Sequence, residues 1–376
     1  MQRHAAIPPV LLVAILILVL FATPGCGSEA AKDTIEDVPE ATVDVDWERP
    51  LAAPKDMGGI SIQQTLDGGY FIVGSTDCRY GTMMHITGCD ILLIKTDPSG
   101  NVEWQKQSRE WWGLDSAFQT SDGGYMFGFN DKLIKTDAAG NEEWQKALPR
   151  VSDTGSIVGQ TSDGGYIVLG TTVYLGGNAG ADAWLAKTDP SGSVEWEKTL
   201  GNGFGEAIRQ TFDNGFIILC QKTHPNTGWL LKTDWTGQQE RDGVFGHGAV
   251  SGITQTSDGG FILSSVNDNG TWLTKLGSTG HFFTVGWDNN YAHGWWPGSI
   301  QQTVDGGCVL LASTGSLISL MKVDSGGQLE WEAPLGDVNI VAPTSDGGYV
   351  GLSYEKDYLT GESDTIRLVK LKVTPP

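Results

Sequence analysis

The chain has 376 residues, and its 24 basic and 45 acidic residues give a formal net charge of −21 at pH 7. A surface this acidic repels phosphate backbones and anionic lipids, which argues against nucleic acid as a partner and against direct binding to a membrane surface. The 52 glycines indicate many tight turns, because glycine adopts positive φ without steric cost.

An export signal is the first predicted element, in residues 1–25. Arg3 precedes an apolar run over residues 10–22, which is too short to span a bilayer and has the layout of a secretory signal. The Gly-Cys pair that ends at Cys26 resembles the end of a lipobox, so we predict that Cys26 is lipidated. An ordinary signal peptide that is cut nearby and an uncleaved anchor are the alternatives.

Residues 26–42 form a predicted tether. They are acidic, rich in small residues and without aromatics, so they cannot bury enough apolar surface to fold. We therefore expect an exported protein in the cell envelope, at the outer membrane or the cell surface. Its contact with the membrane is expected only through the lipid anchor.

One short pattern recurs seven times between residues 43 and 376. Each copy has an Asp-Gly-Gly turn, which is Asp-Asn-Gly in the fourth copy, and a lysine in a later apolar run. The turns begin at Asp67, Asp122, Asp163, Asp213, Asp258, Asp305 and Asp346, and the lysines are Lys95, Lys135, Lys187, Lys232, Lys275, Lys322 and Lys370. The turns are 41 to 55 residues apart, which is the size of one propeller blade.

Each copy is typical of a four-stranded meander, because short β-rich runs alternate with turn residues. The last copy lacks its fourth run, and residues 43–49 are similar to the missing piece. We therefore predict an all-β fold, a seven-bladed β-propeller whose ring is closed by residues 43–49 in the last blade. Because the lysines recur in every blade, we expect them to have a structural role, such as packing their stems and hydrogen-bonding a neighbouring blade.

The Lys-Thr-Asp-x-x-Gly-x-x-x-Trp motif at residues 95–104, 135–144 and 187–196 resembles the tryptophan-docking motif of pyrroloquinoline-quinone-type propeller repeats. Such repeats occur in many secreted or surface-attached prokaryotic propellers. The resemblance implies that tryptophans are buried between blades, at Trp47, Trp104, Trp144, Trp196 and Trp331. Arg241 and Thr284 are expected at this position in the fourth and fifth copies.

Cofactors are not expected. Quinoprotein enzymes of the resembled family have eight blades, a vicinal disulfide and a calcium-bound quinone, whereas this chain has seven copies and no Cys-Cys pair. The acidic turns lack the ligand spacing of a calcium loop, and no metal site is expected. Outer-membrane assembly lipoproteins share the repeat and are not enzymes.

Two pairs of cysteines have different expected roles. Cys78 and Cys89 bracket a long predicted loop, and an exported protein meets an oxidising environment, so we predict a disulfide. The alternative is a copper site that also uses His85 and a neighbouring methionine. Cys220 and Cys308 lie in apolar runs and are expected to be buried free thiols.

The two faces of the ring are predicted to differ. The first face carries the tight turns and is expected to be plain, whereas the second carries the long loops, where binding residues usually lie. The loop aromatics and cations predict a ligand site on this loop-rich face, with the candidates Trp111, Trp112, Trp287, Tyr291, His293, Trp295, Trp296, Tyr80, Arg79 and Arg109. Plugging of the ring ends by these tryptophans is the alternative.

A non-enzymatic binding or assembly module is the predicted function. Its partner is a protein or a glycan at the loop-rich face, and the protein is expected to be monomeric. No sialidase-type Asp-box, nucleophile elbow or unexplained acid–base pair is present in the sequence. The alternatives are a glycan-active enzyme of the sialidase or lyase type and a quinoprotein-like oxidoreductase.

Overall fold

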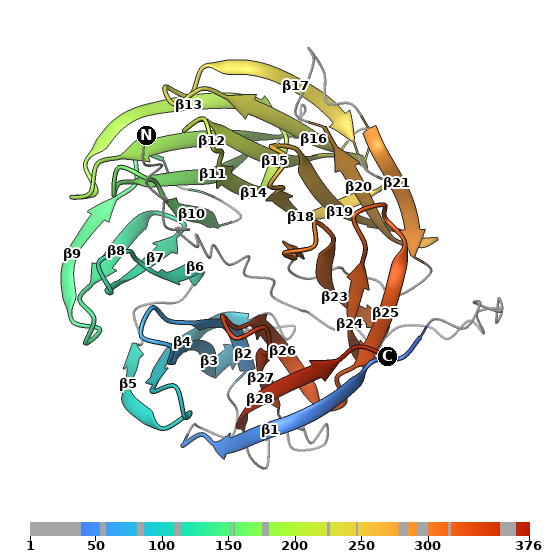
Figure 1. Cartoon of the computed structure of the whole chain (residues 1–376). Helices are drawn as coiled ribbons and strands as arrows, with labels where there is room; N and C mark the ends of the chain where they lie inside the picture. Colours follow the sequence, from blue (N-terminus) through green and yellow to red (C-terminus); the bar gives the residue numbers. More distant parts are fainter. Residues whose placement is uncertain are drawn as a thin grey trace, which may run out of the picture.

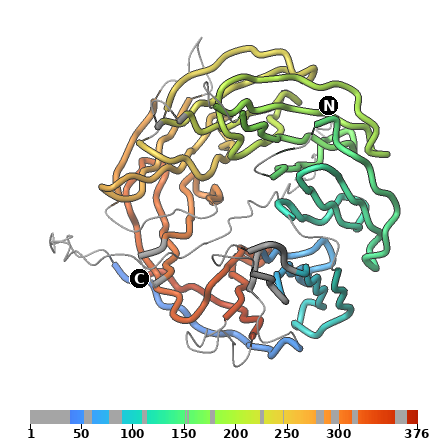
Figure 2. Tube along the Cα trace, turned by 180° about the vertical axis from the view of Figure 1, so that it is seen from behind, coloured from blue at the N-terminus to red at the C-terminus, as the bar shows by residue number. Residues whose placement is uncertain are grey.

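The computed structural model describes residues 39–52, 58–80, 86–108, 114–150, 152, 155–174, 180–223, 226–245, 247–277, 285–291, 300–314, 317–353 and 366–376. These residues form seven four-stranded antiparallel sheets and no helix. Figure 1 shows the sheets arranged as blades in a ring, and Figure 2 shows the same ring from behind. The predicted seven-bladed β-propeller is confirmed.

Six blades consist of four consecutive strands each. Blade 1 contains β2 (Gly58–Gln64), β3 (Tyr70–Tyr80), β4 (Ile86–Thr96) and β5 (Val102–Ser108). Blade 2 contains β6 (Leu114–Gln119), β7 (Tyr125–Phe129), β8 (Lys132–Thr136) and β9 (Glu142–Ala147). Blade 3 contains β10 (Ser156–Gln160), β11 (Tyr166–Tyr174), β12 (Gly180–Thr188) and β13 (Val194–Asn202).

The second half of the ring follows the same plan. Blade 4 contains β14 (Phe204–Gln210), β15 (Phe216–Thr223), β16 (Asn226–Thr233) and β17 (Gln239–Phe245). Blade 5 contains β18 (Ala249–Gln255), β19 (Phe261–Asn267), β20 (Gly270–Leu276) and β21 (Val285–Tyr291). Blade 6 contains β22 (Ile300–Gln302), β23 (Cys308–Thr314), β24 (Leu317–Val323) and β25 (Leu329–Pro334).

Blade 7 closes the ring with strands from both ends of the described chain. β26 (Val338–Pro343), β27 (Tyr349–Ser353) and β28 (Arg367–Thr374) are joined by β1 (Thr42–Pro50), which is the outer strand of this blade (Figure 1). β1 pairs with β28 so that Trp47 faces Lys370. The predicted closure is therefore confirmed.

The pairing with the ring begins before β1. Ala41 N donates to the Glu332 carbonyl oxygen (2.8 Å), and Glu332 N donates to the Pro39 carbonyl oxygen (3.2 Å). Residues 39–41 thus pair with β25 of blade 6, and the Ala41 side chain is buried. The segment that precedes the closing strand is consequently held by blade 6 as well as by blade 7.

The apolar core is divided into layers between neighbouring blades. In the layer between blades 1 and 2, Phe71 and Val73 from β3 pack with Tyr125 and Phe127 from β7, and all four are buried. The middle strands are mostly buried on both faces, as in β7 and β8, because they have a blade on each side. The outer strands alternate between half-buried and exposed residues, as in β5.

The Asp-Gly-Gly turns explain why two glycines recur. In blade 1, Gly68 has φ +83°, a conformation that favours glycine. A Cβ on Gly69 would lie 2.7 Å from Lys95 Nζ, so the second glycine leaves room for the lysine head. The turn therefore fixes the hairpin and makes space for a charged group.

The predicted long loop of blade 1 is mostly strand. β3 and β4 continue as a paired hairpin to Tyr80 and Ile86. The side chains of Cys78 and Cys89 lie outside the described residues, so the disulfide between them stays a prediction. Cys220 and Cys308 are buried free thiols, as predicted.

No helix in the described ranges has the length and hydropathy needed to cross a membrane. The predicted signal and most of the tether, residues 1–38, lie outside those ranges.

Candidate functional site

Each repeated lysine lies in a polar cluster at the turn face, the face with the Asp-Gly-Gly turns. In blade 3, Lys187 Nζ donates to Thr188 O (2.8 Å) and Glu195 Oε2 (3.0 Å) and pairs with Asp163 Oδ2 (2.9 Å). These three acceptors satisfy the three donors of the ammonium group. Blades 1, 2, 4 and 6 repeat the Asp–Lys–Glu arrangement. The lysines are therefore structural, as predicted, but the acceptors named here belong to their own blade.

The seams between blades are bridged by glutamines instead. Gln210 Oε1 of blade 4 accepts a hydrogen bond from Ser162 N of blade 3 (2.8 Å). Equivalent bonds join five other pairs of neighbouring blades, including Ser345 N of blade 7 to Gln64 Oε1 of blade 1 (2.7 Å). Between blades 6 and 7, Pro343 replaces the glutamine. In the other six seams this network fixes the turn of one blade against the next.

The tryptophans on outer strands dock onto the following blade, as the resemblance implied. Trp104 stands opposite Lys95 and donates from Nε1 to Ala138 O in blade 2 (3.2 Å). Its ring lies 5.5 Å from that of Tyr125, and a Cβ on Gly140 would lie 3.1 Å from it. Trp104 is half-buried, not fully buried as predicted, because β5 is the outer edge of its blade.

The predicted departure in blade 5 is wrong. Trp287, and not Thr284, faces Lys275 and donates from Nε1 to Ser325 O of blade 6 (3.0 Å). Tyr291 is buried in the same seam, and its hydroxyl donates to Gly327 O (2.6 Å). Trp287 and Tyr291 therefore lie in β21 and pack on blade 6, and not in a loop as predicted. Their role in ligand binding stays a prediction. In blade 4, Arg241 does face Lys232, as expected.

The other predicted ligand residues are not brought together by the described structure. Trp111, Trp112, His293, Trp295, Trp296 and Arg109 lie outside the described residues. Arg79 and Tyr80 end β3, and their side chains are also outside the description. The predicted site on the loop-rich face stays a prediction.

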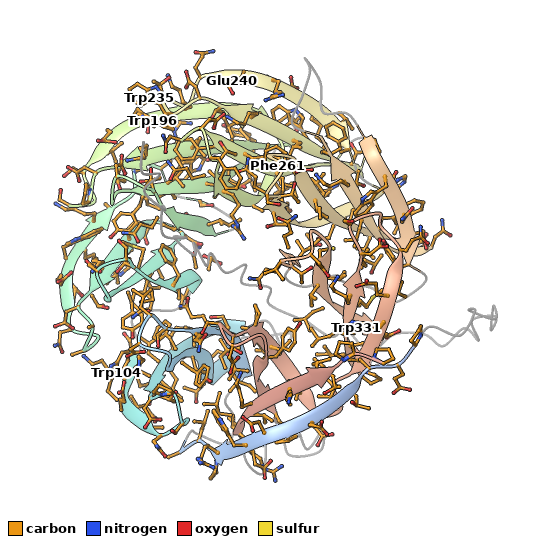
Figure 3. The ribbon with its side chains drawn as sticks, viewed as in Figure 1. Trp104, Trp196, Trp235, Glu240, Phe261 and Trp331 are labelled. Carbon is orange, nitrogen blue, oxygen red and sulfur yellow. The ribbon has the colours of Figure 1, made fainter. Side chains whose placement is uncertain are left out.

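An open groove lies on the turn face between blades 3 and 4. Its volume is about 710 Å³, and its lining consists of Ser162, Asp163, Lys187, Glu195, Trp196, Gln210, Asp213, Asn214, Phe216 and Trp235. This volume is within the range of small-ligand sites. Figure 3 shows Trp196 and Trp235 beside one another at the edge of the ring.

Trp235 forms the exposed part of this groove. It follows Asp234 in the turn between β16 and β17, and 67% of its surface is exposed. The equivalent turn positions are Pro98, Ala138, Pro190 and Ser325, so the repeat does not require an aromatic residue here. Trp235 was not predicted as a site residue, although its departure from the turn pattern is visible in the sequence.

Exposed apolar side chains are frequent on the same face. Leu66 and Phe212, each 71% exposed, and Val304 occupy the residue before the Asp of an Asp-Gly-Gly or Asp-Asn-Gly turn. Ser121, Ser162, Ser257 and Ser345 occupy this position in the other blades. The turn face is therefore not plain, contrary to our expectation.

The charge state of the groove is fixed by hydrogen bonds. Partial burial raises the pKa of Asp163, but hydrogen bonds from Thr161, Lys187 and Gly165 outweigh this effect and hold the pKa at about 2. Asp213 has a lowered pKa for the same reasons, burial being outweighed by bonds from Thr211 and Lys232. Both carboxylates are thus ionised at neutral pH.

Two acidic side chains belong to the first strands of their blades. Asp115 and Glu206 occupy β-bulges in the inner strands β6 and β14. Burial raises the pKa of each to about 7, and for Asp115 it does so against a hydrogen bond from Ser156 N. Because the strand β10 of blade 3 lies between them, they form no dense acid–base cluster within the described residues.

A histidine cluster in blade 5 is also new. His247 Nε2 lies 2.7 Å from Asp288 Oδ2, and its ring stacks on Trp272 with 3.7 Å between centroids. Thr274 Oγ1 donates to the other carboxylate oxygen (2.8 Å). The cluster joins the segment before β18 to β20 and β21. In the described part of the chain, no three metal-ligating side chains lie close enough to hold an ion.

Comparison with solved structures supports the fold. No protein family profile and no curated protein matches the sequence. The WD40 domain of Neurospora crassa Pan2 is similar with a TM-score of 0.60 and 9% identity, over 89% of this chain and 97% of that one. A chain of the mitotic checkpoint complex has a TM-score of 0.60 and 8% identity, over 94% and 98%. A puromycin hydrolase has a TM-score of 0.50 and 15% identity, over 82% of this chain and 53% of that one. At these identities the likeness shows a propeller fold and no more.

Proposed function

We propose that this protein is a non-enzymatic binding or assembly module of the cell envelope that docks a protein partner on its turn face. The observation that carries the proposal is the combination of the groove between blades 3 and 4 with the exposed Trp235 and Phe212 of blade 4. Large exposed aromatic side chains on a rigid scaffold are typical of protein-binding surfaces.

The repeat supports a binding role for this face. Most polar groups at the turns are used within the ring: the lysines are saturated by acceptors and the glutamines bridge the seams. The apolar residues Leu66, Phe212 and Val304 have no such structural role, because serine replaces them in other blades. A partner that covers this face would bury them.

Export and lipid anchoring at Cys26 belong to the same proposal. The sequence of residues 1–26 supports them, and residues 39–41 pair with blade 6, so the chain would enter the ring at this blade. Labelling with a fatty-acid probe tests the anchor. Label should be present in the wild type and absent in Cys26→Ser, and label that persists in the variant would contradict it.

Site-specific photo-crosslinking in the native host tests the docking face. A benzoylphenylalanine placed at Phe212 or Trp235 should give the same protein adduct, identified by mass spectrometry. Tyr174 is the matched control, because it is also an exposed aromatic residue and lies at the opposite end of its blade, at the end of β11. Adducts at Tyr174 and none at Phe212 or Trp235 would move the interface to the loop-rich face and overturn the proposal.

A further inference from the structure

The groove between blades 3 and 4 is a local addition to the repeat. Eight of its lining residues have counterparts in other seams; for example, Lys187, Glu195 and Trp196 correspond to Lys95, Glu103 and Trp104. Trp235 and Asn214 are the two residues that depart from the pattern. The repeat therefore accounts for eight of the lining residues, but not for Trp235 and Asn214.

Asn214 replaces the first glycine of the Asp-Gly-Gly turn and keeps its backbone conformation. Its φ is +64°. Among the described residues, all others with positive φ are glycines. Asparagine tolerates this conformation better than most residues, yet less well than glycine. Its Oδ1 accepts a hydrogen bond from Ser162 Oγ of blade 3 (3.1 Å). No described group bonds to its Nδ2. The side chain thus ties the two walls of the groove together and leaves a donor for a ligand.

The charge of the groove favours a cation. Asp163, Glu195 and Asp213 contribute three negative charges to the lining. Lys187 in the lining and Lys232, which pairs with Asp213 at 2.9 Å, contribute two positive charges, which leaves a formal charge of −1. The Lys187 ammonium group has no donor left for an anion, whereas Glu195 Oε1 has no hydrogen-bond partner among the described residues. A cationic group is attracted, and an anionic group is repelled, by this arrangement.

Trp235 offers the complementary surface. A cation over an indole face is stabilised by the ring quadrupole. This protein already uses that contact: Arg49 lies 5.6 Å from the Trp47 ring centroid, Lys106 lies 5.9 Å from that of Trp104, and Lys222 lies 4.4 Å from that of Trp229. In the described structure no cation covers Trp235. Its exposed ring is therefore open to a cation from another molecule.

We infer that the groove between blades 3 and 4 receives an arginine or lysine side chain from a basic segment of a partner protein, held by Trp235 and Glu195. The inference rests on the proposed function and names the chemistry of the partner. The net charge of −21 extends the attraction beyond the groove and would accelerate association at low ionic strength.

The probe for this inference is a short peptide of alternating arginine and glycine, with a citrulline–glycine peptide as its uncharged isostere. Binding to the purified protein is followed by calorimetry and by the indole N–H signal of Trp235 in NMR spectra, assigned with Trp235→Phe. The arginine peptide should bind about tenfold more tightly than the citrulline peptide, and Trp235→Ala should weaken it about fivefold.

Matched variants separate a specific groove from general acidity. Glu195→Gln should weaken the arginine peptide about threefold. Glu143→Gln is the control. Glu143 pairs with Lys135 at 3.0 Å, and Glu195 pairs with Lys187 at the same distance. Both glutamate side chains are 47% exposed. A further variant combines Trp235→Ala with Ala138→Trp, which moves the indole to the equivalent turn position in the seam between blades 1 and 2. This double variant should recover part of the affinity for the arginine peptide.

Equal binding of the citrulline peptide, or equal losses in Glu195→Gln and Glu143→Gln, would overturn the inference. A crosslinked partner whose capture is insensitive to Trp235→Ala, Glu195→Gln and salt would also overturn it, while leaving the proposed function intact. Conversely, specific arginine binding without a crosslinked partner would support the groove chemistry and contradict the proposed function.

Discussion

Trp196 of blade 3 packs directly on Gly237 of blade 4. A Cβ added to Gly237 would lie 2.7 Å from Trp196 Cζ3, closer than real Cβ contacts. The same contact recurs between Trp47 and Gly100, Trp104 and Gly140, and Trp144 and Gly192. Because the turn glycine of each of these blades has no side chain, the tryptophan of the preceding blade can pack directly on its backbone.

Gly237→Ala should destabilise the ring more than Gly123→Ala. Both glycines have positive φ, 76° and 87°, so both substitutions carry a backbone cost of about 1 kcal/mol. A Cβ on Gly123 meets nothing within 4 Å, whereas one on Gly237 displaces Trp196. We expect an additional loss of about 1–3 kcal/mol for Gly237→Ala, measured as the free energy of unfolding in urea. Equal losses would show that the tryptophan contact is not tight.

Trp287→Ala should destabilise the ring about as much as Trp104→Ala. Both indoles donate to a backbone carbonyl of the next blade, at 3.0 and 3.2 Å. Because both are half-buried, each loss should be about 2–3 kcal/mol, below the 3–5 kcal/mol of a fully buried aromatic residue. Thermal melting measures both, with Trp235→Ala as a control that should stay near the wild type. A Trp287→Ala variant of wild-type stability would mean that the contact of Trp287 with blade 6 does not stabilise the ring.

The architecture was readable from the sequence because every blade repeats the same local chemistry. The Asp-Gly-Gly turns and the Lys-to-Trp spacing predicted the strands, the blade number and the closing strand. Thr284 was placed wrongly because Lys275 and Trp287 are 12 residues apart in blade 5, whereas Lys95 and Trp104 are 9 residues apart in blade 1, so counting residues from Lys275 stopped short of Trp287.

The groove was not predicted because it depends on two residues that break the repeat. Trp235 and Asn214 lie in different turns, and only the fold brings them to one groove. The repeated turns were expected to be plain, and a ligand site was expected only on the long loops. Turn positions where one copy differs from all others were the signal that could have revealed Trp235.

Removal of β1 should destabilise the whole ring. A chain that begins at residue 52 loses the strand that pairs with β28 and the Trp47 contact with blade 1. The unpaired edge of β28 should also promote aggregation. The control begins at residue 39, which keeps the pairing of Pro39 and Ala41 with β25. Equal melting temperatures of the two chains would mean that blade 7 does not need its outer strand.

Acid should unfold the protein between about pH 4 and pH 2. Hydrogen bonds from Thr256 and Gly260, against partial burial, lower the pKa of Asp258 to about 2, and bonds from Thr303 and Lys322 do the same for Asp305. Unfolded Asp titrates near pH 3.9. A lowered folded pKa stabilises the fold above the unfolded pKa, and this stability is lost as the pH falls through the folded value. Urea midpoints measured from pH 6 to pH 2 test this, and a constant midpoint over that interval would contradict it.

Asp115→Asn should stabilise the protein at neutral and alkaline pH and have little effect in acid. The pKa of Asp115 is raised to about 7 because its carboxyl is buried, with one hydrogen bond from Ser156 and a buried Oδ2 that has no partner among the described residues. A raised folded pKa means that the unfolded chain ionises first, so the destabilisation grows as the pH rises from about 4 to about 7 and is complete above that. Asparagine keeps an acceptor for Ser156 and never ionises.

The expected gain for Asp115→Asn is about 2 kcal/mol at pH 8, and almost none at pH 4, in the free energy of unfolding in urea. Asp97→Asn is the control, because hydrogen bonds from Asn101 lower the pKa of this exposed turn aspartate instead of raising it. It should not stabilise the protein at pH 8. If Asp115→Asn destabilises the ring at pH 8, the ionised carboxylate has a partner that offsets its burial, and β6 would then hold a charge that the fold requires.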